Sequence, residues 1–142
     1  MMETKPDVLK ALRLLLADVT SAETGVDHEL PAGFNTKAGI RPFVRLSLED
    51  VISDVSDNRY ETARVRVDCF ARSDGEARAL AREVRSVALP PENVVGGYSG
   101  TPEGQGENPA RILGISVYSG PYPLPDPTDL DVYRMILSVP YR

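Results

Sequence analysis

The sequence predicts an α+β fold, a two-layer sandwich in which two helices pack on one face of a mostly antiparallel sheet of about four strands. Two stretches, residues 4–19 and 76–89, repeat apolar residues at helical spacing. Two others, residues 43–49 and 59–70, alternate apolar and polar residues as half-buried strands do. Two helices and a sheet that each have one apolar face are expected to cover one another in two layers.

Length and composition indicate a single domain, residues 1–142. Hydrophobic residues make up 42% and charged residues 26%, which argues against wholesale disorder. The 16 basic and 21 acidic side chains give a net charge of -5, which offers no overall positive field for nucleic acid. The longest apolar run, residues 14–17, is too short for a membrane span or a secretory signal, so we expect a protein that stays in the cytoplasm.

The first helix is expected over residues 4–19. Thr4 is the expected N-cap, with Asp7 three residues later, and Pro6 lies in the first turn, where its missing N–H costs little. The apolar stripe of this helix consists of Val8, Leu9, Leu12, Leu15, Leu16 and Val19.

Two strands around a polar turn at residues 53–58 are predicted to form an antiparallel pair. The apolar face holds Val44, Leu46 and Leu48 in the first strand and Ala63, Val65, Val67 and Cys69 in the second. The polar face of the second strand holds Thr62, Arg64, Arg66 and Asp68. A short extended piece at residues 26–30 precedes this pair.

The second helix begins at a capping box formed by Ser73 and Glu76, and Pro90 and Pro91 end it. Its apolar stripe consists of Ala77, Leu80, Ala81, Val84 and Val87. Residues 90–111 then form a long connection rich in glycine and proline. A connection of this length in so small a domain is usually functional or disordered.

Two more strands are expected near the end of the chain, at residues 112–118 and 131–141. Between them, prolines at every second position from 121 to 127 give an extended stretch that cannot donate ladder hydrogen bonds. The strand at 131–141 has apolar residues on both faces, which places it inside the sheet or against a partner.

No residue pattern predicts catalysis, a metal site or a cofactor site. His28 is the single histidine, and Cys69 is in register with buried positions, so we interpret it as a core residue. The carboxylates near residues 49–57 and 126–131 lack the spacing of a calcium loop and are typical of turns. The glycine-rich loop lacks the spacing of a phosphate-binding loop.

Basic residues gather in the middle of the chain. Residues 59–85 hold seven arginines and five acidic residues, a local charge of +2 on an acidic protein. The sequence predicts a basic zone made of Arg64, Arg66, Arg78, Arg82 and Arg85. This zone is either a solvated face or a surface complementary to an acidic neighbour, such as an identical subunit.

The layout of the chain resembles one known family. A leading helix over residues 6–19 and a strand over 42–48 precede the run TARVRVDCFA at residues 62–71, which the second helix follows. The chain closes with SGPY at residues 119–122 and DVYRMILSV at 131–139. In this order and at this size, the elements resemble the tail terminator proteins (minor tail, tail-completion) of long-tailed bacteriophages.

The resemblance implies a virion structural protein and no enzyme. Such proteins form a hexameric ring of identical subunits, cap the head-proximal end of the tail tube and stop its growth. They bind the major tail tube protein and offer a surface to the head-completion protein. The resemblance implies location in the virion, after assembly in the host cytoplasm, without sequence-specific nucleic-acid or membrane binding. Residues 53–59, 90–111 and 119–130 would be contact loops that order on assembly.

The candidate residues of a subunit or partner interface are Arg59, Arg64, Arg66, Arg78, Arg82, Arg85, Tyr98, Tyr118, Tyr122, Asp126 and Asp129. Two other interpretations stay open. The chain can be a head–tail connector or neck protein of the same small α+β kind. In a different class, it can be a small enzyme that uses Cys69, or carboxylates such as Asp68 and Asp74, in a cleft under the long loop.

Overall fold

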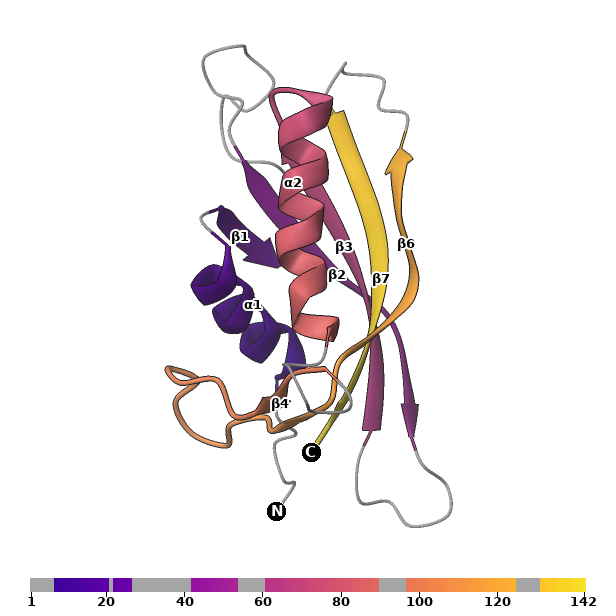
Figure 1. The fold of residues 1–142 in the computed structure, drawn as a ribbon. Coiled ribbons are helices and arrows are strands. Elements are labelled where there is room, and N and C mark those ends of the chain that lie inside the picture. The colour runs from indigo at the N-terminus through magenta and orange to yellow at the C-terminus, as the bar shows by residue number, and fades with distance from the viewer. Residues whose placement is uncertain (1–6, 21, 27–41, 54–60, 90–96, 125–130) are drawn as a thin grey trace.

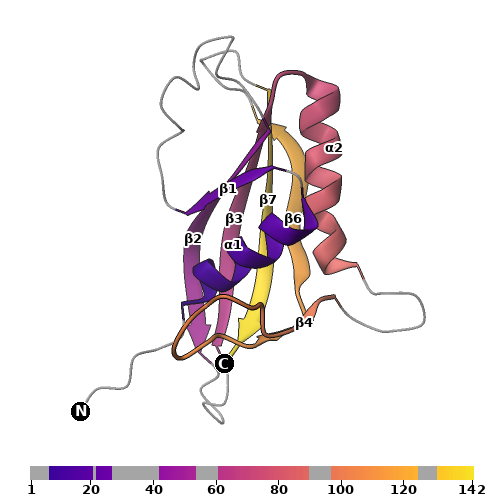
Figure 2. The same ribbon diagram turned by 90° about the vertical axis from the view of Figure 1, so that its left-hand side faces the viewer.

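The computed structural model describes residues 7–20, 22–26, 42–53, 61–89, 97–124 and 131–142. In chain order the elements are α1 (Val8–Val19), β1 (Glu23–Val26), β2 (Phe43–Ser53), β3 (Glu61–Ala71), α2 (Asp74–Arg85), a 3-10 turn η1 (Ser86–Ala88), β4 (Ser99–Gly100), β5 (Ile112–Leu113), β6 (Ser116–Leu124) and β7 (Asp131–Tyr141). Both helices lie on the same side of the sheet (Figures 1 and 2), α1 against β1 and β2, and α2 against β3 and β7.

In the described ranges the strands form one mixed sheet of seven strands that curls into a half-barrel, so this part of the chain is mostly β. The strand order is β1-β2-β3-β7-β5-β4, and β6 also pairs with β7. The predicted sandwich of about four antiparallel strands is therefore wrong. Strands β1, β4 and β5 have two to four residues each, which is too short for alternation to reveal them. The sheet is mixed because β1 runs parallel to β2.

Helix α1 begins later than the expected first helix. Its N-cap is Asp7, not Thr4, and the Asp7 carboxylate accepts a hydrogen bond from the Lys10 amide at 3.1 Å. At the other end, the Thr20 hydroxyl donates to the Leu16 carbonyl at 2.8 Å. Helix α2 begins where the capping pattern predicted, because the Ser73 hydroxyl accepts from the Glu76 amide at 3.2 Å.

The centre of the sheet is the antiparallel trio β2, β3 and β7, in which β3 pairs with β7 over its whole length and with β2 from Glu61 to Phe70. Strand β2 is four residues longer than the predicted strand at residues 43–49. Its pairing with β3 shifts between Leu48 and Asp50, so a bulge at Glu49 breaks the alternation that marks a strand. Strand β7 lies inside the sheet, which is one of the two positions that its apolar faces allowed.

The predicted strand at residues 112–118 is two strands. Gly114, with a φ of 101°, separates β5 from β6. Strand β6 continues through Pro121 and Pro123, which the sequence placed in an extended stretch without ladder donors. Because β6 pairs only with β7 in the described part of the chain, it is an edge strand, where proline is tolerated.

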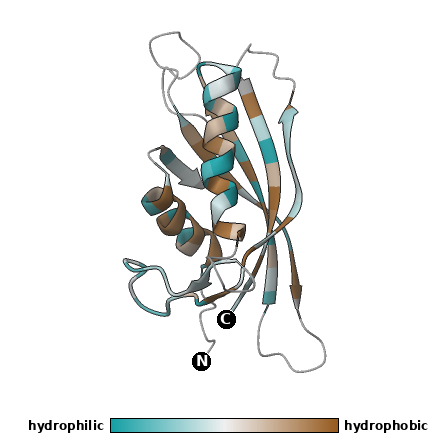
Figure 3. Ribbon diagram, viewed as in Figure 1, coloured by the Kyte–Doolittle hydropathy of each residue, from teal (hydrophilic) through white to brown (hydrophobic). Residues whose placement is uncertain are grey.

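The core lies between the helices and the face of the sheet that they cover. The hydropathy of the strands alternates along the chain (Figure 3), and each helix buries one apolar side. The largest fully buried side chains include Leu12, Leu16, Val65, Val67 and Leu137, which come from α1, β3 and β7. Val65 and Val67 of β3 point toward the helices. Every second residue of this strand from Thr62 onward therefore lies on the opposite face of the sheet, away from the helices.

Gly97 gives a test of this packing. A Cβ at this position would lie 2.0 Å from the Ile115 carbonyl oxygen and 2.8 Å from that of Val87, and neither backbone can move freely. We expect Gly97→Ala to lower the free energy of unfolding by about 1–3 kcal/mol through overpacking.

Gly75→Ala is the matched control because nothing lies within 4 Å of the Cβ that it would add. In α2 it should be neutral or stabilise by up to about 1 kcal/mol. Urea denaturation of the two variants measures both effects, and equal stabilities would contradict the packing.

Candidate interaction surface

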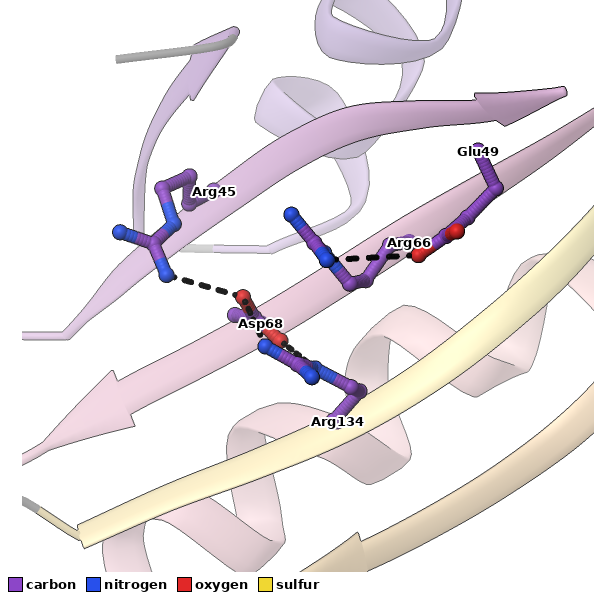
Figure 4. A network of polar contacts seen from close by, with 5 residues as sticks. All are labelled: Arg45, Glu49, Arg66, Asp68 and Arg134. Atoms are coloured by element: carbon purple, nitrogen blue, oxygen red, sulfur yellow. Dashed lines mark hydrogen bonds and ion pairs between the residues drawn. The ribbon is translucent and has the colours of Figure 1, made fainter. Parts of the chain in front are cut away.

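The sheet face opposite the helices carries a row of three charged residues that are directly opposite one another on adjacent strands. Arg45 of β2 pairs in register with Asp68 of β3, and Asp68 pairs in register with Arg134 of β7. The carboxylate of Asp68 therefore lies between two guanidinium groups (Figure 4). In the described ranges no helix covers this face, which we call the open sheet face.

Asp68 is fully buried, and both of its oxygens are occupied. The Arg45 Nη2 donates to Oδ2 at 3.0 Å, and the Arg134 Nε donates to Oδ1 at 2.7 Å. The hydrogen bond from Arg134 to Asp68 also raises the pKa of the Arg134 guanidinium above its ordinary value. The two arginines, from the two neighbouring strands, thus neutralise the buried carboxylate. Without them, its burial would cost a large amount of folding free energy.

Looser ion pairs continue along the same face toward the β2–β3 hairpin. The Arg66 Nη1 lies 3.4 Å from the Glu49 carboxylate (Figure 4), and the Arg64 Nη1 lies 3.7 Å from that of Asp50. The Arg64 guanidinium also lies 4.2 Å from the ring centroid of Tyr118, one of the most exposed apolar side chains. The Nε of Arg66 is shielded from solvent and donates to no partner among the described residues.

A small apolar cluster closes the other end of the open sheet face. Phe43, Phe70 and Val132 are in register on β2, β3 and β7, and Leu124 of β6 packs against them. The Arg45 guanidinium lies 5.0 Å from the centroid of the Phe70 ring. Buried carboxylate, arginines and aromatic rings thus follow one another along this face.

The structure separates the predicted basic zone into two surfaces. Arg64 and Arg66 belong to the open sheet face, whereas Arg78, Arg82 and Arg85 lie on α2, on the opposite side of the sheet. The interpretation of these five arginines as one zone is therefore wrong, because β3 turns its odd and even residues to opposite faces.

Arg78 is part of a bonded group. Its Nη2 lies 2.7 Å from the Asp74 carboxylate, and its Nε donates to the Tyr133 hydroxyl at 3.3 Å. The Tyr133 hydroxyl in turn donates to Asp74 at 2.7 Å. These contacts connect the first turn of α2 to β7, so Arg78 holds the helix on the sheet.

The tyrosine candidates have different environments. Tyr122 is opposite Arg134 in register, so it belongs with Tyr118 near the open sheet face. Tyr98 is half-buried, and burial, followed by the charge of Asp18, raises the pKa of its hydroxyl. It lines a cavity of about 480 Å³ between α1 and the loop that contains Pro102 and Glu103. Candidates Arg59, Asp126 and Asp129 lie outside the described residues.

Sequence reasoning missed Arg45 and Arg134 as members of this surface. The alternation in residues 43–49 put Arg45 on the polar side of its strand, and the second face of the last strand contained Arg134. The alternation within one strand does not show how that strand is aligned with its neighbours. This alignment is what brings both residues to Asp68.

The loop after Tyr98 is organised around one side chain. The Gln105 amide nitrogen donates to the carbonyls of Pro102 and Ala110 at 2.8 and 3.1 Å, and its oxygen accepts from the Ala110 amide at 2.8 Å. Gln105 itself is buried. Part of the expected contact loop at residues 90–111 is thus internally bonded in the chain alone, and residues 119–124 of another belong to β6.

The residues of the enzyme interpretation do not form a shared site. Cys69 is fully buried, and burial followed by the charge of Asp68 raises the pKa of its thiol far above its ordinary value. Asp68 is enclosed by arginines on the open sheet face, whereas Asp74 lies on the helix side. His28 lies outside the described residues.

The described ranges contain no group of three or more potential metal-ligating side chains among histidine, cysteine, aspartate and glutamate. They also contain no helix long and apolar enough to cross a membrane. Comparison with models of known protein families and with curated proteins finds no match to the chain.

The buried carboxylate predicts a large effect from a small substitution. Asp68→Asn keeps the size of the side chain but leaves two half-buried arginines without a counter-charge, so we expect the free energy of unfolding to fall by about 2–4 kcal/mol. Asp50→Asn removes an exposed carboxylate from the same face and should cost less than about 1 kcal/mol. Denaturant titration compares the two, and equal losses would show that the Arg45–Asp68–Arg134 row is not the stronger interaction.

The burial of the Cys69 thiol predicts that it reacts slowly with thiol reagents. Because the Cys69 sulfur is shielded and its pKa is raised, we expect a disulfide reagent at pH 8 to leave the native protein unmodified while it labels the unfolded chain fully. Absorbance of the released thiolate follows the reaction. Labelling of the native protein at the rate of the unfolded chain would restore Cys69 as an accessible nucleophile.

Proposed function

We propose that this chain is a structural subunit that assembles with copies of itself into a ring. The observation that carries the proposal is the open sheet face, which combines the named arginines with the exposed Tyr118 and Tyr122. Arginine and tyrosine are enriched at protein–protein contacts. Four arginines, at 45, 64, 66 and 134, face three carboxylates there, at 49, 50 and 68, so the face is locally positive on a chain of charge -5.

A ring of identical subunits needs two different patches on each copy that fit one another. A locally positive sheet face on an acidic protein supplies one such patch and leaves acidic surface elsewhere for the other. This asymmetry supports a head-to-tail arrangement of copies, because electrostatic complementarity selects both partner and orientation.

Within this class, the role we propose is that of a phage tail terminator. The succession of α1, β2, β3, α2 and β7 keeps the layout on which the resemblance rests. The subunits would form a hexameric ring on the head-proximal end of the tail tube, stop its growth and bind the head-completion protein. The inaccessible Cys69 and the separation of Asp68 from Asp74 support a structural role over an enzymatic one.

Two arginines from opposite sides of the sheet provide the test. Arg64 lies on the open sheet face and Arg82 is exposed on α2, so Arg64→Ala and Arg82→Ala remove the same side chain from different surfaces. We expect light scattering over a range of concentrations to give the mass of a ring of several subunits. The ring should form from the chain alone or after purified tail tubes are added. Arg64→Ala should raise the concentration for half-assembly about tenfold, which equals about 1.4 kcal/mol, and Arg82→Ala should not.

Several outcomes would contradict the proposal. A chain that stays monomeric at every concentration and neither binds tail tubes nor limits their length is not a terminator. Binding to the portal or neck in place of the tube would assign the connector role. Equal effects of the two arginine substitutions would remove the open sheet face from the subunit contact.

A further inference from the structure

The cavity beside Tyr98 combines apolar walls with negative charge. It has a volume of about 480 Å³ and lies between α1 and the loop that follows β4, and every residue that lines it belongs to the described ranges. Leu14 and Pro102 contribute apolar side chains, whereas Asp18 and Glu103 contribute carboxylates. None of the lining residues is basic. We call this feature the acidic cavity.

The two carboxylates of the acidic cavity are available to a partner. Asp18 and Glu103 are both exposed, and neither forms an ion pair with another described residue. The charge of Asp18 contributes to the raised pKa of Tyr98, so this carboxylate acts on the aromatic side chain of the same cavity. Carboxylates beside an aromatic ring suit a guanidinium group, which forms ion pairs with carboxylates and stacks on aromatic rings.

The loop that contains Glu103 has its shape before any partner binds. Three hydrogen bonds of the buried Gln105 amide hold its backbone. Gly104, whose φ is 91°, brings the loop against α1, since a Cβ there would lie 3.8 Å from both terminal carbons of Leu14. A wall that is already ordered loses little conformational entropy on binding.

The open sheet face presents side chains that match this cavity. The Arg64 guanidinium lies 4.2 Å from the ring centroid of the exposed Tyr118. The ion pair of Arg64 with Asp50 is long, at 3.7 Å, and both side chains are partly exposed, so Arg64 can exchange this partner at little cost. Arg64 and Tyr118 together offer a cation and an aromatic surface to a neighbouring molecule.

Strand register places the two patches at the same end of the sheet. Gly100, just before the loop, pairs with Ile112, which pairs with Tyr141 of β7. Tyr141 pairs in turn with Glu61, three residues before Arg64 in β3. The acidic cavity lies against α1 on the helix side (Figure 1), so the patches are on opposite sides of the sheet. Copies that join through them need little shift along the strands, which favours a closed ring over an open filament.

We propose that the acidic cavity of one copy receives Arg64 and Tyr118 of the next copy. This inference rests on the proposed function and adds the second patch that a ring of identical subunits needs. Asp18 and Glu103 bind the guanidinium, and Tyr98 and the apolar walls contact the tyrosine ring. Charge complementarity identifies a second copy as the occupant, because the open sheet face is locally positive on a chain of charge -5.

Substitutions that remove charge without changing shape test the cavity. Asp18→Asn and Glu103→Gln do this within it. Glu107→Gln is the matched control, because Glu107 is exposed on the same loop and does not line the cavity. By light scattering, we expect the double variant Asp18→Asn/Glu103→Gln to raise the concentration for half-assembly at least about tenfold, and Glu107→Gln to change it less than about twofold.

An exchange of charge between copies tests the pairing itself. We expect Arg64→Glu and Glu103→Arg each to stay dissociated at concentrations where the unsubstituted chain assembles. An equal mixture of the two variants should assemble again, because every junction of an alternating ring then joins a glutamate to an arginine. Circular dichroism checks the fold of each variant, and Asp18→Arg replaces Glu103→Arg if the latter does not fold.

The outcomes separate this inference from the proposed function. If the unsubstituted chain forms a ring that the double variant forms equally well, or if the mixed variants stay apart, the acidic cavity is not the second patch and the ring proposal stands. If the unsubstituted chain forms no ring, alone or on tail tubes, the proposed function and this inference both fail.

Discussion

The carboxylate of Asp68 between Arg45 and Arg134 is the constraint on which the central sheet depends. Side chains of a strand alternate with a period of two, so a slip of β3 by one residue would move Asp68 into the apolar core and Val67 out of it. An unpaired buried carboxylate is far more costly than a misplaced valine. The register is therefore specified twice, by apolar packing on the helix side and by charge on the other.

The same register divides the molecule into two surfaces with different properties. On the helix side, Arg78, Asp74 and Tyr133 connect α2 to the sheet and are used within the fold. On the open sheet face, the ion pairs lengthen from 2.7 Å at Asp68 to 3.7 Å at Asp50. The face is thus tightly bonded at its centre and loosely paired near the β2–β3 hairpin, where charged side chains can rearrange toward a partner.

Local patterns in the sequence predicted much of the fold and little of the surface. The Ser73 cap and the apolar face of β3 follow from short-range spacing, whereas the apolar residues on both faces of β7 left two positions open, of which the one inside the sheet is observed. The number of strands and the mixed topology do not, because the two-residue strands have no periodicity and β1 meets β2 across a long connection. Register, which joins Arg45 to Asp68 and separates Arg64 from Arg78, is a long-range property that a single strand pattern cannot contain.

Gln105 has a consequence for how this protein can change over evolution. Its buried amide supplies three hydrogen bonds that hold the loop from Pro102 to Ala110, while Glu103 and Glu107 point to solvent and contribute none of them. The shape of the loop is thus encoded at one position, and the character of its outer surface at others. Substitutions at the outer positions can alter what the loop recognises without altering the scaffold, so this loop is free to diverge faster than the sheet beneath it.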